Sequence, residues 1–371
     1  MSDSYRAAGV DLDAGDAASK LFYEASKQTW SNRDGLFGQI ESPVHLFSAV
    51  RFLKLPVDSD AVIGINFDGV GTKVEVAERV GDHHTIAYDL LAMICDDAAI
   101  TGAEPAVVGT IVDFSQVSVN VARELASGMI SAAAAARVAV INGEIAELGN
   151  RVGGYSTNSY NWGGAALWAA RRERLLTGTG IRPDQRIVAV REKGLRSNGL
   201  SLTRRILSRE HGERWHVAPF HGTTFGKAAL HPSTIYTRLI TTLTGGLSGE
   251  ALCAVSGMVH VTGGGIPGKL ARILRVAQCG ALLDDLFEPC ALMLYCQEHG
   301  DVNDTDAYRT WNMGQGLLVI SESPDIVVST AHELGFEAKI CGSTRKGLAI
   351  DIASKGYYGN RGNTSLSFGV D

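Results

Sequence analysis

Residues 68–73 combine the side chains that hold a metal ion with those that hold a phosphate. Their order is Asp68-Gly69-Val70-Gly71-Thr72-Lys73, and an apolar run over residues 61–66 before them predicts a strand. An acidic residue at the end of a strand can hold a hard metal ion through its oxygens. Glycines let the backbone approach a polyphosphate, and a lysine adds a mobile positive charge. A tight turn with a surface lysine fits the same residues, because two glycines two residues apart are a weak signal.

Residues 85–101 predict a helix that carries three aspartates. Its apolar residues recur at helical spacing: Ile86, Leu90, Met93 and Ile94. Asp89 and Asp96 are seven residues apart and share a face, and Asp97 lies about 100° round the helix from Asp96. Aspartate is mildly unfavourable inside a helix, and three of them beside apolar positions are more than solubility requires. A solvated acidic face is the alternative.

Two further glycine-bearing segments precede predicted helices. Residues 194–199 lead into a helix over residues 200–210, where Ser197 or Asn198 is a suitable N-cap. The run Gly263, Gly264 and Gly265 follows a strand over residues 255–261. The N-terminus of a helix is a favourable anion site, and a triple glycine costs backbone entropy that close approach to a phosphate would explain. In that case, Gly264→Val should weaken phosphate binding far more than it lowers thermal stability, whereas a purely structural turn predicts the reverse.

Strands and helices alternate along the chain, which is typical of layered α/β domains. In the first half, strands are expected at residues 61–66, 106–114, 138–142 and 163–170 (the last a strand or a short helix), and helices at 17–28, 85–101 and 119–136. In the second half, strands are expected at 187–190, 255–261, 316–321, 338–341 and 348–352, and helices at 200–210, from His231, at 270–275, 289–297 and 324–334. A change in character over residues 171–186 predicts a boundary between domains 1–180 and 181–371. The glycine-rich tail after Lys355 is typical of a mobile segment or an interface arm.

Composition excludes several classes of protein. The chain has 371 residues, a net charge of −6 and no basic block, which argues against nucleic acid as a partner. No apolar run reaches the roughly 18–20 residues of a membrane span, and the polar N-terminus does not resemble a signal peptide. The six cysteines are scattered without a CxxC pair, so we expect reduced thiols in a cytoplasmic protein rather than a zinc site.

Several of these motifs, in this order and spacing, resemble the aminoimidazole ribonucleotide synthetase family, also called phosphoribosylformylglycinamidine cyclo-ligase. The resemblance extends over nearly the whole chain and is carried by DGVGTK at 68–73, HTIAYDLLAM, CDD and TGAEP within 84–105, GEIAE at 143–147, GLRSNGLSL at 194–202, HVTGGGIPGKLARIL at 260–274, GVDLDAG at 9–15 and YRTWNMG at 308–314. Several motifs in register are more specific than any one of them.

The resemblance implies an ATP-dependent ring closure in purine synthesis. ATP phosphorylates the amide oxygen of formylglycinamidine ribonucleotide, and a nearby nitrogen then attacks the activated carbon and expels phosphate. Phosphoryl transfer of this kind depends on positioning and charge neutralisation. The family fold is two α/β domains in a homodimer, with the N-terminal domains paired into a β-barrel across the two-fold axis.

The resemblance also implies roles for individual residues. Mg²⁺ would be held by Asp68 and Asp97, with support from Asp89, Asp96 and Glu144. The ATP or substrate phosphates would be bound by Gly69, Gly71, Thr72, Lys73, Ser197, Asn198, Gly263, Gly264 and Gly265. His260 would transfer a proton or orient the amide, and a structural histidine is the alternative. Lys73 and Glu144 would join His260 in catalysis.

Two loops depart from the family pattern. The family has a glycine-rich Gly-Gly-Phe-Gly-Gly-Leu-Phe where this chain has residues 31–37, and only Gly35, Leu36 and Phe37 are kept. Residues 142–150 differ from the family's Gly-Gly-Glu-Thr-Ala-Glu-Met-Pro-Gly. Asp96 replaces an asparagine, and Arg196 replaces a histidine. The metal and phosphate core is kept, whereas the loops that face the substrate have changed.

These departures leave other functions open. The chain could be another ATP-using member of the superfamily, of the selenophosphate synthetase or hydrogenase-maturation type, although no catalytic N-terminus of the selenophosphate type is present. It could also be a non-catalytic or differently specific nucleotide-binding paralogue.

Overall fold

The computed structural model describes residues 12–41, 52–54, 60–362 and 364–370, in two compact units. Unit 1 contains the described residues up to Ala98 together with Ala103–Arg172, and unit 2 contains Ala99–Gly102 and the residues from Glu173 onward. The first residues of the GVDLDAG motif, 9–11, lie outside the described residues. Each unit has its own sheet and its own helices, so each is described separately.

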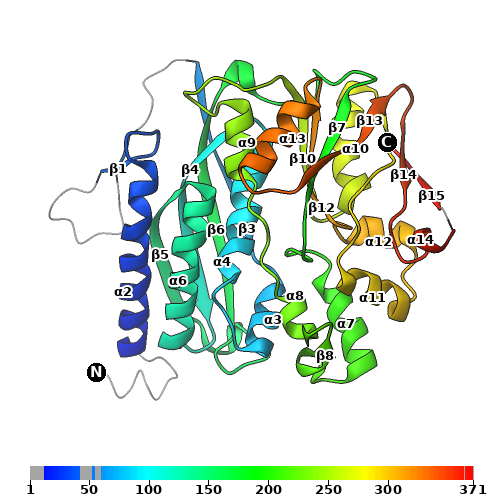
Figure 1. The fold of residues 1–371 in the computed structure, drawn as a ribbon. Coiled ribbons are helices and arrows are strands. Elements are labelled where there is room, and N and C mark those ends of the chain that lie inside the picture. Colours follow the sequence, from blue (N-terminus) through cyan, green and yellow to red (C-terminus); the bar gives the residue numbers. More distant parts are fainter. Residues whose placement is uncertain (1–11, 42–51, 55–59, 363, 371) are drawn as a thin grey trace. The chain divides into compact units, whose positions relative to one another are not determined.

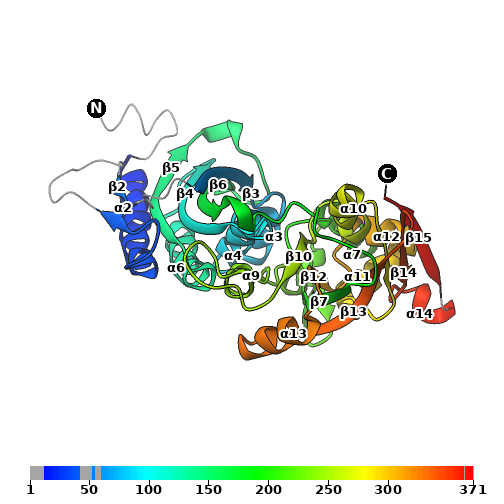
Figure 2. The same cartoon turned by 90° about the horizontal axis from the view of Figure 1, so that it is seen from above.

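Unit 1 is an open four-stranded sheet with helices on one face. Its elements are α2 (Leu12–Thr29), η1 (Trp30–Arg33), β1 (Ile40–Glu41), β2 (Phe52–Leu53), β3 (Ala61–Gly69), α3 (Lys73–Val80), α4 (Ile86–Leu91), η2 (Ala92–Asp96), α5 (Asp97–Ala99), β4 (Glu104–Phe114), α6 (Val119–Ala136), β5 (Ala139–Glu147), η3 (Gly149–Arg151) and β6 (Tyr160–Arg171). The strand order is β3-β6-β4-β5, in which only the pair β4 and β5 is parallel. Figure 2 shows α2, α6 and α4 side by side along this sheet. The barrel implied by the resemblance is not formed within one chain, since β3 and β5 are the edges of the sheet.

Local sequence explains the helix α6. Ser118 caps it by accepting a hydrogen bond from the backbone N–H of Val121 at 3.4 Å. Its buried face is formed mainly by alanines, which have the highest helix propensity. The helix ends at Arg137, whose φ of 57° is left-handed. Its bounds coincide with those expected from the sequence.

Unit 2 is built on a mixed seven-stranded sheet. Its elements are η4 (Arg172–Arg174), β7 (Arg186–Arg191), α7 (Leu200–His211), η5 (Trp215–Val217), β8 (Pro219–Phe220), β9 (Thr223–Thr224), α8 (Phe225–Ala229), α9 (Thr237–Thr244), β10 (Val255–His260), α10 (Gly265–Ala277), β11 (Gly280–Leu283), α11 (Ala291–Gly300), α12 (Asp304–Thr310), β12 (Gln315–Ser321), α13 (Pro324–Glu333), β13 (Ala338–Arg345), β14 (Ala349–Ala353), α14 (Gly359–Gly362) and β15 (Ser365–Gly369). The order of the sheet is β10-β12-β7-β13-β11-β14-β15.

The core of unit 2 lies between the sheet and the pair α9 and α13. Side chains from both helices pack on β7, β12 and the neighbouring strands: Leu239, Ile240, Leu243, Val327, Ala331, Val188, Val190, Leu317 and Val319. Figure 1 shows α10 at the level of β10, and the two elements are in contact. The arrangement confirms two α/β units with mixed sheets.

Three expectations for local structure are wrong. The strand expected to end at residue 142 continues to Glu147 as β5. Residues 231–236 are not helical, and α9 begins at Thr237; the peptide before Pro232 disfavours the helical conformation. The tail is not mobile, because β15 pairs antiparallel with β14 and buries Leu366 and Phe368; the alternative of an interface arm stays a prediction. Within the described residues, no helix is long and apolar enough to cross a membrane.

Candidate functional site

The predicted metal and phosphate turn begins later than its sequence indicates. β3 continues through Asp68 and Gly69, so only residues 70–72 form the turn before α3. The Oδ1 atom of Asp68 accepts a hydrogen bond from the N–H of Gly69 at 2.7 Å. Gly71 has a φ of 69°, which explains a glycine at this position. Asp68, Gly71 and Thr72 are exposed and accessible to a ligand.

Lys73 is not the mobile charge expected from its sequence context. Its side chain is fully buried at the start of α3, and its Nζ lies 2.7 Å from Oδ1 of Asp89 on α4. Asp89, predicted as a metal ligand, is also fully buried in this pair. A buried ion pair of this kind is costly to break, because the remaining charge loses its partner. In this structure the pair fastens the turn at residues 70–72 to α4.

Asp96 and Asp97 lie where the helix changes its geometry. α4 continues into a π turn, η2, and Asp97 begins α5. π turns inside helices are often found at functional sites, and the extra residue rotates the aspartates relative to a regular helical wheel. The side-chain amide of Asn66 on β3 donates to the carbonyl of Ile94 in this turn at 2.8 Å. Asp68 is two residues after Asn66 and therefore lies on the same face of the sheet, toward η2.

Glu144 lies on the opposite face of that sheet from Asp68. Asp68 pairs with Gly164, Gly164 with Thr110, and Thr110 with Gly143. Directly paired residues point to the same face, and successive residues alternate, so Glu144 points away from the face of Asp68. Its side chain is exposed there. The register therefore separates a predicted supporting residue from the predicted metal ligand.

The predicted Mg²⁺ ligands fit the ion only in part. Across the described parts of the chain, one group of three His, Cys, Asp or Glu residues has ligand atoms within 4.8 Å of one another, namely Asp82, His84 and Glu124. Asp68, Asp89 and Asp97 are not gathered in this way. Mg²⁺ commonly takes one or two carboxylates and completes its shell with water and substrate phosphates. Asp68 is exposed and Asp97 half-buried, which suits that role, whereas Asp89 is engaged by Lys73.

In unit 2, the predicted phosphate-binding residues of two segments come together. A Cβ added to Gly263 would lie 3.5 Å from the side-chain nitrogen of Asn198. The Oγ atom of Ser197 and the Oδ1 atom of Asn198 are buried without a hydrogen-bond partner. Buried polar atoms are normally paired, so the hydroxyl of Ser197 is a donor available to a ligand, next to an asparagine whose side-chain nitrogen lies beside Gly263. The next helix, α10, begins at Gly265 with no side-chain cap on its N-cap residue, Gly264.

The three glycines have different local constraints. Gly264 has a φ of 91°, which strains any side chain at this position whatever the surrounding space. Gly265 has a φ of 61°, and a Cβ there would lie 1.9 Å from the carbonyl oxygen of Tyr308. Gly263 has neither constraint. Gly264→Val therefore adds backbone strain to any effect on binding, so this variant does not separate a phosphate role from a structural one, and the expectation for it stays a prediction.

His260 is part of a buried polar network that the sequence did not predict. Arg196 makes a short hydrogen bond to Nε2 of His260, and its Nη1 lies 2.6 Å from Oε2 of Glu192. All three side chains are almost completely buried. A guanidinium group only donates hydrogen bonds, so Nε2 of His260 accepts in this contact. In this arrangement Nε2 is not available to a substrate, which favours an orienting or structural role for His260.

Glu192 is the centre of this network. Its carboxylate accepts hydrogen bonds from the backbone N–H groups of Lys193 and Thr234 at 2.9 and 3.2 Å, and from the hydroxyl of Thr234 at 3.2 Å. The network fixes Arg196, whose φ of 61° is unusual for a residue with a side chain, directly before Ser197 and Asn198. The spacing of Glu192 and Arg196 by four residues is the only sequence signal for this pair.

Residues 31–38, the altered loop, are held by another buried arginine. Arg33 donates from Nε to the carbonyl of Phe37 at 2.9 Å, and its Nη2 lies 2.7 Å from Oε1 of Glu104. Burial lowers the pKa of Arg33, and Glu104 acts in the opposite direction. A Cβ at Gly38 would lie 2.7 Å from Cβ of Ala106. This loop is therefore packed against β4 and held in a fixed position. It differs in this from the glycine-rich loop that the family pattern has here.

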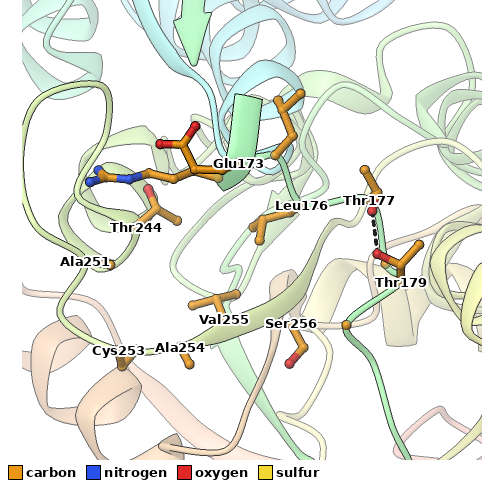
Figure 3. Close-up of a pocket in the computed structure, with 14 residues that line it drawn as sticks. Glu173, Leu176, Thr177, Thr179, Thr244, Ala251, Cys253, Ala254, Val255 and Ser256 are labelled. Carbon is orange, nitrogen blue, oxygen red and sulfur yellow. Dashed lines mark hydrogen bonds between the residues drawn. The ribbon is translucent and has the colours of Figure 1, made fainter. Parts of the chain in front are cut away.

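A cavity in unit 2 is separate from these residues. It has a volume of about 390 Å³ and is lined by residues 173–180, Thr244, Ala251 and residues 253–256. Figure 3 shows the hydroxyls of Thr177 and Thr179 hydrogen-bonded to each other at its edge, at 2.9 Å. None of the residues predicted to bind metal or phosphate lines it, so the cavity is not the candidate site.

Comparison with known proteins assigns the family. Residues 50–163 match the family model of the AIR synthase related protein N-terminal domain, and residues 182–352 match that of its C-terminal domain. The chain is 35% identical over 349 residues to phosphoribosylformylglycinamidine cyclo-ligase from Sorangium cellulosum, covering 92% of this chain and 95% of that protein. It belongs to the phosphoribosylformylglycinamidine cyclo-ligase family. The cyclo-ligase from Burkholderia lata is 33% identical over 322 residues, 87% of each chain. This family membership confirms the resemblance and makes the protein an enzyme of the ligase class.

Solved structures share the fold of this cyclo-ligase family member at low identity. Thiamine-monophosphate kinase from Stenotrophomonas maltophilia aligns with a TM-score of 0.64 and 15% identity, covering 89% of this chain and 95% of the kinase. Hydrogenase maturation protein HypE in complex with ATP aligns with a TM-score of 0.56 and 12% identity, covering 81% and 84%. T. maritima PurL complexed with FGAR aligns with a TM-score of 0.55 and 13% identity, covering 95% of this chain and 52% of PurL.

Proposed function

We propose that the protein converts formylglycinamidine ribonucleotide to aminoimidazole ribonucleotide in purine biosynthesis. The reaction closes the imidazole ring and consumes ATP. The identity to named cyclo-ligases over most of both chains supports this function. The structural observation that carries it is the buried hydroxyl of Ser197, a donor without a hydrogen-bond partner, next to Asn198, whose side-chain nitrogen lies beside Gly263. Such a site suits a phosphate of the substrate or of ATP.

Each unit contributes a separate part of this chemistry. In unit 2, Ser197, Asn198 and the glycines before α10 bind phosphate oxygens through N–H and O–H groups and the N-terminus of the helix. In unit 1, Asp68 and Asp97 would hold Mg²⁺. Gly69 at the end of β3 and the exposed residues Gly71 and Thr72 of the turn would contact the phosphates of ATP. When bound, the ion neutralises charge on the phosphates. Lys73 supports the site by holding the turn at residues 70–72 in place through its ion pair with Asp89. We also propose that the protein is located in the cytoplasm.

The proposed reaction is tested by a coupled assay of ADP release. The purified protein is supplied with ATP and Mg²⁺, with formylglycinamidine ribonucleotide present or absent. We expect ADP release that depends on this substrate, with aminoimidazole ribonucleotide formed in equal amount. ATP binding without substrate-dependent release would instead support a differently specific or non-catalytic paralogue. Two observations favour such a paralogue. Arg33 holds the loop at residues 31–38 in a fixed position, and Arg196 occupies Nε2 of His260 with a hydrogen bond.

The phosphate role of the glycine run is tested by Gly263→Ala. Its added Cβ meets the side-chain nitrogen of Asn198 at an ordinary contact distance, so we expect little loss of thermal stability. Loss of charge-assisted hydrogen bonds to a phosphate should weaken binding of ATP or substrate about 10- to 100-fold. Calorimetric titration of the folded variant with each ligand measures this effect. Normal affinity for both ligands would contradict the proposal, and Gly265→Ala serves as a control that should lose stability instead.

We further propose that the protein is a homodimer through the helix-free face of the sheet in unit 1. Large apolar side chains are exposed on this face, with Ile65 55% and Phe67 73% accessible on the edge strand β3 and Ile111 53% accessible on β4. Alternation along β3 places Ile65 and Phe67 on one side, and the register places Ile111 on the same side. Exposed apolar patches of this kind mark association surfaces.

Sedimentation at micromolar concentration should therefore give about twice the chain mass. Phe67→Glu should convert the dimer to monomer, because a charge cannot be buried unpaired in an apolar interface. Val276→Glu is the matched control, since Val276 is 53% exposed on α10 in unit 2. A monomeric wild-type protein, or a dimer that survives Phe67→Glu, would count against this surface.

A further inference from the structure

A histidine and two carboxylates with the spacing of metal ligands lie in unit 1, distinct from the residues proposed for ATP. Asp82 and His84 lie in the turn between α3 and α4, and Glu124 lies on α6. Nδ1 of His84 is 3.3 Å from Oδ1 of Asp82 and 3.6 Å from Oε2 of Glu124. We propose that these three residues bind a divalent transition-metal ion of the Zn²⁺ class.

The backbone holds both carboxylates at the imidazole. The N–H of His83 donates to Oε2 of Glu124 at 2.9 Å, and the N–H of His84 donates to Oδ1 of Asp82 at 3.2 Å. The turn lies directly on α6, because a Cβ at Gly128 would be 1.9 Å from the carbonyl oxygen of His84. Glycine is unfavourable inside a helix, so its presence one turn after Glu124 permits this close approach. The helix face that carries Glu124 is therefore shaped to receive the 82–84 turn.

The spacing of the ligand atoms suits a tetrahedral ion. Bonds of 2.0–2.2 Å from Zn²⁺ to nitrogen and oxygen place neighbouring ligand atoms of a tetrahedron about 3.3–3.6 Å apart. The two distances from His84 Nδ1 agree with this spacing, and the third pair of ligand atoms is within 4.8 Å. Three protein ligands leave one position for water, which the exposure of His84 and Asp82 permits. Imidazole favours Zn²⁺ and its neighbours over Mg²⁺, which prefers oxygen ligands alone.

Titration of the chelator-treated, full-length protein with Zn²⁺ tests the site. No ATP or purine nucleotide is present, so the result is independent of the proposed cyclo-ligase activity. We expect one Zn²⁺ per chain by calorimetry, undisturbed by excess Mg²⁺. His84→Ala should weaken this binding by at least the roughly 10- to 100-fold that loss of an outer-shell partner costs at metal sites.

Two further variants separate metal binding from folding. Glu124→Gln keeps an oxygen that can accept from the N–H of His83 but removes the anionic ligand, so it should weaken Zn²⁺ binding without lowering the melting temperature of the metal-free protein. His221→Asn removes an exposed imidazole from unit 2 at a φ of 44°, which asparagine tolerates, and should leave binding unchanged. Absence of Zn²⁺ binding at millimolar concentration, or equal affinity in the wild-type and His84→Ala proteins, would overturn the proposal. The three side chains would then be only a histidine paired with two carboxylates.

Discussion

Replacing Glu192 by alanine should lower the free energy of unfolding by about 3–5 kcal/mol, the usual cost of removing one partner from a buried ion pair. The substitution leaves the guanidinium of Arg196 buried beside His260 without its carboxylate. It also removes the acceptor for three backbone N–H groups, those of Lys193, Gly194 and Thr234, and for the hydroxyls of Thr234 and Tyr236. Denaturant unfolding at neutral pH, followed by circular dichroism, measures the difference.

Glu337→Ala is the matched control for this prediction. Glu337 binds two cations, Lys193 and Arg191, each at 2.7 Å, but its side chain is 45% exposed. Hydrogen bonds from Lys193 and Arg191 lower the pKa of Glu337 to about 2. Its stabilising effect is therefore present above the ordinary pKa of 4.5 and is lost as the pH falls toward 2. Solvent screening limits the effect to at most about 1 kcal/mol, so equal losses in the two variants would contradict the role of burial.

Asp97→Asn should reduce substrate-dependent ADP release by about 10²- to 10³-fold while the protein stays folded. The expected loss follows from the several kcal/mol that a metal ion contributes to charge stabilisation, at 1.36 kcal/mol for each factor of ten. Asparagine has nearly the same shape as aspartate, and the half-buried Asp97 begins the short helix α5 after the π turn. The rate at saturating ATP and at several Mg²⁺ concentrations measures the effect.

Asp16→Asn is the control for the carboxylate change, because Asp16 is an exposed residue on α2. It should retain the wild-type rate. Wild-type activity of Asp97→Asn at low Mg²⁺ would remove Asp97 from the proposed metal site. A folded but inactive Asp97→Asn protein that still binds ATP without Mg²⁺ normally would agree with the assignment.

The amino-acid sequence by itself determined the α/β class, most of the strands and helices, and the family. Period-two and period-3.6 patterns of apolar residues are local properties, so β4, α6 and β12 were located within two residues of their ends. Family motifs likewise depend on the order of residues along the chain. The sequence showed that Arg33 and Arg196 depart from the family pattern, but it did not show which residues they contact.

Tertiary structure alone decided which polar side chains meet. Lys73 and Asp89 are 16 residues apart, and Arg196 and His260 are 64 apart, so their pairing depends on how the elements pack. The strand register likewise decided that Asp68 and Glu144 face opposite sides of one sheet. A charged side chain is soluble and mobile on the surface but must find a partner when it is buried. Burial is set by the folded packing of the whole unit, so the sequence around Lys73 could not distinguish a phosphate ligand from a structural ion pair.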